Sequence, residues 1–329
     1  MKVLVTGGAG YIGSHVVRQL AAAGHDIVVF DNLSTGYRWA VTAGELVVGD
    51  LADEQALEAV FSEYRFEAVL HFAANIVVPE SVANPLKYYS NNTRNTLNLL
   101  KMVERYQVPY MVFSSTAAVY GMPEQTVLTE DLPLAPINPY GASKMMSERM
   151  MMDLAAASNL NYVILRYFNV AGANPDGLLG QATPEATHLI KVACECVTGQ
   201  RDGMSVFGTD YETRDGTCVR DYIHVEDLAK AHVMALDYMA KGGESQVLNC
   251  GYGRGFTVRE VIDVVKAESG VDFPVQETGR RAGDPAALMA DNTRIKGVLG
   301  WQPDFDDLNT IVRTALAWEK IWQQKKAGH

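Results

Sequence analysis

Short apolar runs recur along the chain, and stretches with the apolar spacing of helices separate them. Six of these runs predict strands, at 2–6, 26–30, 68–73, 110–114, 161–167 and 246–250. Most of them are apolar at nearly every position, which is typical of strands buried on both faces of a parallel sheet. The alternation of strands with helices therefore predicts an α/β fold built on a doubly wound parallel sheet.

Two stretches interrupt this alternation. Residues 170–219 are rich in Gly, Asn, Asp, Pro and Thr around one helix-like run at 186–198, and residues 251–329 combine loops with two or three helices. We therefore predict two domains. The sheet domain comprises residues 1–169 plus about 221–250, and a smaller, discontinuous α/β lobe comprises about 170–220 plus 251–329.

The first predicted strand runs directly into a glycine turn that opens a helix. Gly7, Gly10 and Gly13 let the backbone approach an anion, and the free N–H groups and the dipole of the helix attract it. About 20 residues further on, the second strand ends at Asp31, where a carboxylate can accept the ribose hydroxyls of NAD and repel the 2′-phosphate of NADP. An ordinary turn that binds nothing is the alternative. Glycines, strand, helix and acid together favour a dinucleotide site in a Rossmann-like domain.

Other candidate binding residues are found at the ends of the predicted strands. Ligands of a parallel sheet bind beyond the carboxyl ends of its strands. Residues with suitable side chains or small size at such places are Asp50, Leu51, Ala73, Ala74, Ser114, Ser115, Thr116, Phe168 and Asn169.

A second motif places a tyrosine and a lysine on one helix face. Asn138 and Pro139 suit the start of a helix, so Tyr140 and Lys144 are four residues apart within it. A nearby ammonium and a cationic nicotinamide both favour the phenolate of a tyrosine, whose ordinary pKa is about 10. Such a phenolate can take a proton from a sugar hydroxyl while hydride leaves its carbon. A surface pair on an amphipathic helix is the alternative, which the glycine turn and the strand-end hydroxyls disfavour.

Composition limits the possible partners. The net charge of −11 opposes binding to nucleic acid or to an anionic membrane, so an anionic ligand needs local cations. We find no signal sequence and no segment apolar enough to span a bilayer, and we expect a cytoplasmic protein. Cys194, Cys196, Cys218 and Cys250 lack the paired spacing of a zinc site, so no metal is expected. We interpret His71, His224 and the methionines of 145–152 as packing residues.

The motifs carry a specific resemblance. Residues Thr6–Gly13 together with Tyr140–Lys144 resemble the extended short-chain dehydrogenases/reductases. Within that family, the UDP-glucose 4-epimerases are similar in the segments Asp31–Ser34, Tyr88–Asn92, Ser114–Gly121, Arg166–Asn169 and Val219–Val225. The likeness extends from Met1 to about Trp301.

The resemblance implies roles for individual residues. It implies that Tyr140 is the base, that Lys144 is its electrostatic partner, and that Thr116 bridges the phenol and sugar O4. NAD would be bound by Gly7, Gly10, Tyr11, Ile12, Gly13, Asp31, Asn32, Asp50, Leu51, Phe72, Ala73, Ala74, Asn91, Lys144 and Phe168. A UDP-sugar would meet Thr116, Tyr140, Asn169, His188, Leu189, Phe207, Arg220, Arg281, Asp284 and Leu288. The two arginines would supply the local cations.

The chain departs from the family pattern at two places. Ile76 stands where some members have a lysine, which removes a cation from the cofactor side. His188 stands where some members have an asparagine, which changes the contact to the uracil or ribose.

The resemblance implies a UDP-hexose 4-epimerase, with UDP-galactose and UDP-glucose as the leading pair, that works through a transient 4-keto sugar with tightly bound NAD. A 4-epimerase of an N-acetylhexosamine, pentose or uronate donor is the main alternative. A 4,6-dehydratase needs an Asp-Glu pair after Thr116, where this chain has Ala117 and Ala118. A non-catalytic NAD sensor would typically lack Tyr140 or Lys144.

We also expect a homodimer. Two predicted helices, at about 86–106 and 140–157, carry more apolar residues than one sheet face should need. The resemblance implies that they pair with their copies in a four-helix arrangement. The residues concerned are Leu97, Leu100, Met102, Val103, Met145, Met146, Met150 and Met151.

Overall fold

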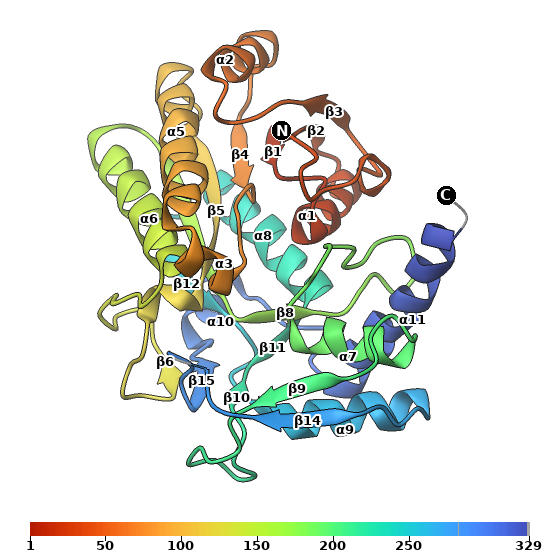
Figure 1. Ribbon diagram of the computed structural model, residues 1–329. Helices are drawn as coiled ribbons and strands as arrows, with labels where there is room; N and C mark the ends of the chain where they lie inside the picture. The colour runs from red at the N-terminus through yellow and green to blue at the C-terminus, as the bar shows by residue number, and fades with distance from the viewer. Residues whose placement is uncertain (282, 328–329) are drawn as a thin grey trace.

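The computed structural model describes residues 1–281 and 283–327. Its centre is a seven-stranded parallel sheet of order β12-β7-β5-β4-β1-β2-β3 (Figure 1). The strands are β1 (Lys2–Thr6), β2 (Asp26–Asp31), β3 (Glu45–Val48), β4 (Ala68–His71), β5 (Tyr110–Thr116), β7 (Asn161–Tyr167) and β12 (Gln246–Cys250). The strand order reverses beside β1, which creates a crevice at the carboxyl edge of the sheet. The predicted doubly wound α/β fold is confirmed.

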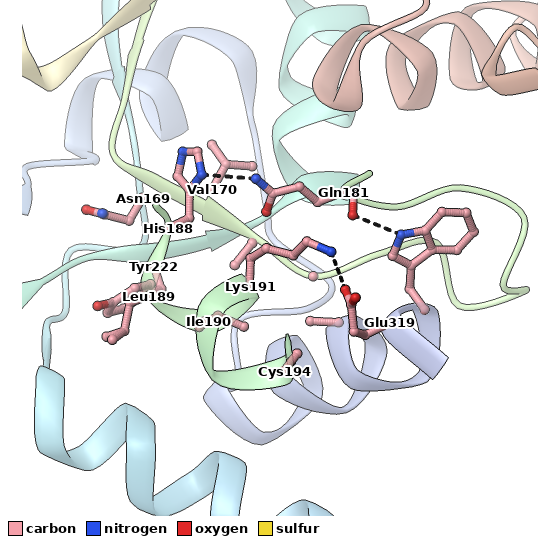
Figure 2. A pocket seen from close by; sticks show the side chains of 14 residues that line it. Asn169, Val170, Gln181, His188, Leu189, Ile190, Lys191, Cys194, Tyr222 and Glu319 are labelled. Carbon is pink, nitrogen blue, oxygen red and sulfur yellow. Dashed lines mark hydrogen bonds and ion pairs between the residues drawn. The ribbon is translucent and has the colours of Figure 1, made fainter. Parts of the chain in front are cut away.

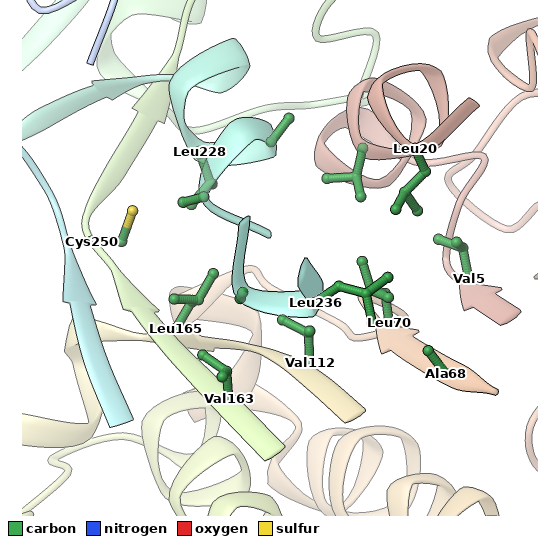
Figure 3. Close-up of a cluster of buried hydrophobic side chains, with 14 of the residues drawn as sticks. Val5, Leu20, Ala68, Leu70, Val112, Val163, Leu165, Leu228, Leu236 and Cys250 are labelled. Atoms are coloured by element: carbon green, nitrogen blue, oxygen red, sulfur yellow. The ribbon is translucent and has the colours of Figure 1, made fainter. Parts of the chain in front are cut away.

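Helices cover both faces of this sheet. One face is packed by α1 (Tyr11–Ala22), α8 (Val225–Ala240) and α10 (Thr293–Leu299), and the other by α2 (Glu54–Glu63), α5 (Asn95–Arg105) and α6 (Pro139–Ala157). Successive strand residues enter opposite cores, so that Val163 and Leu165 belong to the first core (Figure 3) and Ile164 to the second. Burial on both faces explains why these strands are apolar at nearly every position.

The predicted strands agree closely with the observed ones. β1, β7 and β12 have the predicted bounds, whereas β4 ends two residues early and β5 continues to Thr116. The sequence pattern missed β3, because this edge strand is partly exposed and lacks a run of buried apolar residues. The continuation adds Ser115 and Thr116 to the carboxyl end of the strand.

The predicted helix at 86–106 is a composite element. It consists of α4 (Pro85–Tyr88), a π-helical segment (Tyr89–Arg94) and α5, and the short α3 (Val78–Ala83) precedes it. The wider π turn turns the buried Asn92 inward, where its amide donates to the Asn75 carbonyl and to Ser143 Oγ of α6. The irregular turn thus ties this run to the helix that carries Tyr140.

The elements outside the large sheet and its covering helices are called the small lobe below. Its helices α7 (Leu189–Val197), α9 (Val258–Ser269) and α11 (Leu308–Ala327) pack in a third core. Its short strands are β6 (Val127–Leu128), β8 (Asn169–Ala171), β9 (Met204–Phe207), β10 (Val219–Arg220), β11 (Tyr222–His224), β13 (Phe256–Thr257), β14 (Val275–Thr278) and β15 (Ala287–Ala290). Ile295 and Trp301 enter the core of the large sheet, although they lie within the stretch assigned to the lobe. The two-domain division stays a prediction.

The two histidines that we interpreted as packing residues make hydrogen bonds with neighbouring side chains and backbone groups. His71 lies between the hydroxyls of Thr6 and Thr96, and His224 Nδ1 caps α8 by accepting the amide of Glu226. The methionines of α6 pack inward except Met146, which is exposed. None of the helices in the described part of the chain is long and apolar enough to cross a membrane.

Buried histidines predict how stability depends on pH. Burial lowers the pKa of His232 to about 4, against a weaker upward effect of its hydrogen bond to the Leu228 carbonyl. In the unfolded chain a histidine has a pKa of about 6.5. Between these values only the unfolded state binds the proton, so the free energy of unfolding falls as the pH falls, by up to about 1.4 kcal/mol per pH unit.

We expect His232→Leu to reduce this dependence. Leucine removes the titration and leaves the core apolar, so the slope of the free energy of unfolding between pH 6 and 4.5 should be lower by about 1 kcal/mol per pH unit. Urea unfolding of both proteins across this range measures the two slopes. Equal slopes would contradict the assignment of acid sensitivity to His232.

Candidate active site

The glycine turn lies at the carboxyl edge of β1. A Cβ at Gly7 would lie 2.5 Å from the Ala73 nitrogen, and one at Gly13 would lie 2.3 Å from the Gly7 carbonyl oxygen. Gly7 also has φ +73°, in the left-handed region. Only glycine therefore lets α1 start directly over the strand. The N-cap, Gly10, offers no side chain to the first-turn amides, so the turn fits a diphosphate.

Asp31 is fixed at the end of β2, next to this turn. Its two carboxylate oxygens accept the amides of Ala9 (2.9 Å) and Leu33 (2.8 Å). Burial raises the pKa of Asp31, and these two hydrogen bonds counteract that rise. At the next strand end, Asn32 Nδ2 donates to Asp50 Oδ2 at 2.8 Å. The arrangement offers oriented acceptors at the rim where a ribose of a dinucleotide would lie.

The other predicted cofactor residues frame the same edge. Ala73 lies against Gly7, Phe72 packs on His232 with ring centroids 4.8 Å apart, and Asn91 Nδ2 donates to Asn92 Oδ1. Ile12 and Leu51 point into the two cores of the sheet. Tyr11 is turned toward the small lobe, where its hydroxyl donates to the Gly172 carbonyl at 2.6 Å. Phe168 packs against the cluster around Ala117.

The helix α6 carries the predicted catalytic pair. Asn138 Oδ1 accepts the amide of Gly141 at 2.9 Å, which confirms the predicted cap. Tyr140 and Lys144 are both buried, and Lys144 Nζ donates to the Ser114 carbonyl at 2.8 Å. Thr116 is the last residue of β5, the strand that lies under α6. The structure therefore brings the phenol, the ammonium and the strand-end hydroxyl to one edge.

The protonation of this pair is set mainly by burial. Burial raises the pKa of Tyr140 to about 12, and a hydrogen bond with Thr116 acts in the opposite direction. Burial lowers the pKa of Lys144 to about 8, and the Glu148 carboxylate counteracts this. The Lys144 ammonium is held by the Ser114 carbonyl. That its charge favours the phenolate of Tyr140 stays a prediction.

Three predicted substrate residues line one pocket, between β8, α7 and α11 (Figure 2). They are Asn169, His188 and Leu189, and the pocket has about 430 Å³ of empty space, part of it open to solvent. His188 Nδ1 lies 3.0 Å from Gln181 Nε2, and burial lowers the pKa of this histidine. Below it, the buried Lys191 pairs with Glu319. The polar side chains of the lining are thus largely paired with one another, among mainly apolar neighbours.

The other predicted substrate residues form two groups that are not part of the lining of this pocket. The Arg281 guanidinium stacks on the Phe207 ring, 3.6 Å from its centroid, beyond the ends of β9 and β14. Arg220 pairs with Asp284. Leu288 lies opposite Arg220 in the register of β10 and β15, and it packs against the cluster that also contacts Phe168. An aromatic ring and guanidinium groups are the side chains that suit a nucleoside diphosphate.

Sequence reasoning missed several residues around the site. Gln181 and Lys191 line the pocket on either side of His188 in the sequence, and Glu319 comes from a distant segment, so only the folded chain shows that they meet. Glu148 is different, because it follows Lys144 by four residues and its position on the same helix face could have been deduced. Ile76, the first departure from the family pattern, is exposed just before α3.

Comparisons with known proteins agree with this geometry. A model of the NAD dependent epimerase/dehydratase family matches residues 3–251. A UDP-glucose 4-epimerase of Azospirillum brasilense is 56% identical, with 98% of this chain and 93% of that protein covered. The structure of a UDP-glucose 4-epimerase from Brucella ovis in complex with NAD is 46% identical, with a TM-score of 0.93 and coverage of 96% and 97%. A UDP-Glc/GlcNAc 4-epimerase from Campylobacter jejuni is 52% identical, with a TM-score of 0.86 and coverage of 97% and 99%.

Proposed function

The chain belongs to the NAD dependent epimerase/dehydratase family, and from this premise we propose that it inverts C4 of a UDP-hexose, with UDP-galactose and UDP-glucose as the leading pair. NAD is its cofactor. The observation that carries the proposal is the placement of Tyr140 and Lys144 on α6 beside Thr116, at the sheet edge where the glycine turn lies.

In the proposed reaction, each residue of this edge has one task. Tyr140 takes the O4 proton of the sugar, directly or through the Thr116 hydroxyl, and returns it after inversion. Lys144, fixed on the Ser114 carbonyl, keeps a positive charge near the phenol. NAD⁺ bound at the glycine turn would supply the acceptor and later the donor of the C4 hydride, and its cationic nicotinamide would favour the phenolate of Tyr140. This charge is needed because burial alone raises the pKa of Tyr140 to about 12.

The small lobe would hold the UDP part firmly and the hexose loosely. Arg220 and Arg281 supply cations for the diphosphate, Phe207 offers a ring face, and Asn169 and His188 line the adjoining pocket. The 4-keto sugar can then rotate about its bond to the diphosphate and present its other face. At the opposite end of the crevice, the fixed carboxylate of Asp31 would prefer the NAD ribose over the 2′-phosphate of NADP.

A second candidate substrate is a UDP-N-acetylhexosamine. The similar protein from Campylobacter jejuni is described as a UDP-Glc/GlcNAc 4-epimerase. The half-buried Leu288, beside the cluster that contacts Phe168, is intermediate in bulk and cannot donate a hydrogen bond. We therefore propose that plain hexoses are preferred and that N-acetylated ones are turned over more slowly. A dehydratase is disfavoured, because Ala117 and Ala118 cannot transfer protons.

A homodimer and a cytoplasmic location complete the proposal. The apolar faces that suggested a dimer need correction, because Leu100, Met102, Val103 and Met151 are buried in the core of the single chain and Met145 and Met150 pack against buried clusters. Leu97 and Met146 remain, 42% and 41% exposed, on the neighbouring helices α5 and α6. The exposed Val82 and Leu86 of the adjoining α3 and α4 extend this apolar surface. Four free cysteines agree with a reducing compartment.

The first test is conversion of UDP-galactose to UDP-glucose by the purified protein without added NAD. Tyr140→Phe should retain NAD and fold but lose activity by about 10³-fold or more, because phenylalanine cannot exchange the O4 proton. Tyr110→Phe, at the opposite end of β5, is the matched control and should remain active. No conversion by the wild-type protein, even with NAD added, would overturn the proposed function.

The substrate preference is tested at Leu288. Leu288→Tyr should lower kcat/KM for UDP-N-acetylgalactosamine about 10-fold or more while largely sparing UDP-galactose, because the added bulk penalises the larger sugar. Leu288→Met conserves volume and should leave the ratio of the two efficiencies unchanged. If Leu288→Tyr also leaves that ratio unchanged, Leu288 does not border the sugar.

The dimer is tested by placing charges on the exposed surface of α5 and α6. We expect a dimer mass by light scattering at micromolar concentration, and a monomer for the double variant Leu97→Glu/Met146→Glu, because burying two carboxylates opposes association. Leu178→Glu, an equally exposed apolar position in the small lobe, is the control and should stay dimeric. A wild-type monomer would refute this part of the proposal.

A further inference from the structure

Glu148 is a buried carboxylate for which the reaction outlined above has no task. It lies one helical turn beyond Lys144 on α6 and is 1% exposed. Ser115 Oγ donates to its Oε1, and Arg166 donates from Nε at 3.1 and 3.2 Å and from Nη2 at 2.6 Å. All of its partners come from the central strands of the sheet, so this carboxylate attaches the catalytic helix to the sheet.

The two strand partners of Glu148 face each other in the sheet. Ser115 of β5 is in register with Arg166 of β7, so one carboxylate joins two neighbouring strands to α6. Arg166 is held from its other side by Tyr120, whose hydroxyl oxygen accepts Nη1 at 3.0 Å. The guanidinium is therefore fixed by contacts on both sides. Such a buried, fully bonded pair has one geometry, which fixes the register of α6 on the sheet.

The adjacent strand residue holds Lys144 in the same way. Lys144 Nζ donates to the carbonyl of Ser114, and Glu148 accepts from the hydroxyl of Ser115, one residue further along β5. Consecutive residues of one strand thus bind positions one turn apart on one helix. The ammonium and the carboxylate share a buried, low-dielectric region, in which opposite charges act on each other strongly.

Among the charged and titratable groups around Lys144, Glu148 is the carboxylate that acts on the pKa of its ammonium. From α6 the other neighbour is the Tyr140 phenol. From β7 come the Tyr167 phenol and the Arg166 guanidinium, which itself binds Glu148. From β4 comes His71, whose pKa burial lowers to about 3, so that it stays neutral.

On the basis of the proposed function, we propose that Glu148 is a positioning residue for the epimerase reaction: clamped by Ser115 and Arg166, it keeps Lys144 charged and fixed at the end of β5. Burial lowers the pKa of Lys144 to about 8, and the Glu148 carboxylate counteracts this lowering. Without that carboxylate, burial is unopposed and Lys144 loses its proton closer to neutral pH. The phenolate of Tyr140 then lacks the positive charge of the lysine.

The test removes the pair together, because loss of Glu148 alone would leave the Arg166 charge buried without a partner. In Glu148→Gln/Arg166→Met, glutamine keeps an acceptor for Ser115 and the core remains filled. The pH dependence of kcat for UDP-galactose is measured on the NAD-loaded protein. We expect its high-pH limb to move down by about half a pH unit or more, with KM for UDP-galactose nearly unchanged.

A second variant predicts the opposite sign. Arg166→Gln keeps a hydrogen-bond donor for Glu148 but leaves the carboxylate charge unneutralised, so the high-pH limb should move up. Arg149→Gln/Asp153→Asn removes an exposed ion pair from the same helix and is the control, for which we expect no shift. If kcat falls equally at every pH and the high-pH limb does not shift, the ion pair of Glu148 and Arg166 only stabilises the fold, and the proposal is overturned.

A readout on the wild-type protein does not depend on the folding of any variant. With ¹³Cε-labelled lysine, the Lys144 signal, assigned by comparison with Lys144→Met, reports its protonation directly by NMR. The ammonium form persisting through pH 7.5 supports the proposal, and a neutral amine at that pH overturns it. Because this titration needs no turnover, its result is separate from that of the UDP-galactose assay, which tests the proposed function itself.

Discussion

The close approach of backbone to backbone at the sheet's switch point is the constraint on which the rest of the molecule depends. Gly7, Gly13 and the chain after β4 meet at distances that no Cβ would allow. This contact seats α1 directly over β1, which opens the crevice between the diverging halves of the sheet. Asp31 and Thr116 then end two strands at this crevice, and the start of α6 lies on the same side of the sheet. A side chain at Gly7 or Gly13 would displace the helix, and the strand ends would no longer surround a common site.

The net negative charge of the chain is a second constraint, because it opposes the binding of an anionic ligand such as a diphosphate. The protein meets it locally, because the two arginines of the proposed diphosphate site lie beside β10 and β14 of the small lobe, with Arg281 exposed and stacked on Phe207. The deeply buried charges have a different use. Glu148 with Arg166, and Lys191 with Glu319, are paired inside the chain and contribute defined geometry more than stability.

The sequence predicted the strands and motifs that depend on local pattern, and it missed the side-chain pairs that form only when distant elements pack together. Strands β1, β7 and β12 could be delimited because burial on both faces makes them continuous apolar runs. The glycine turn and the Asn138 cap are local motifs whose geometry follows from a few residues. The edge strand β3 has no such signal. The pairs Gln181 with His188 and Lys191 with Glu319 depend on how α7, α11 and the intervening loop pack, which no local spacing encodes.

The proposed dimer surface also shows that local pattern does not identify the packing partner of a helix. Helical periodicity marks Leu100, Met102 and Val103 as apolar but does not say which surface covers them, and in the folded chain the sheet and its neighbouring helices cover all three. Only exposure in the folded chain separates Leu97 from these residues. An amphipathic pattern therefore shows that a helix packs against something, whereas the identity of that partner depends on tertiary structure. Helix α6 illustrates this: its buried side faces β5 and β7 through Lys144 and Glu148, and Met146 lies exposed between them in sequence.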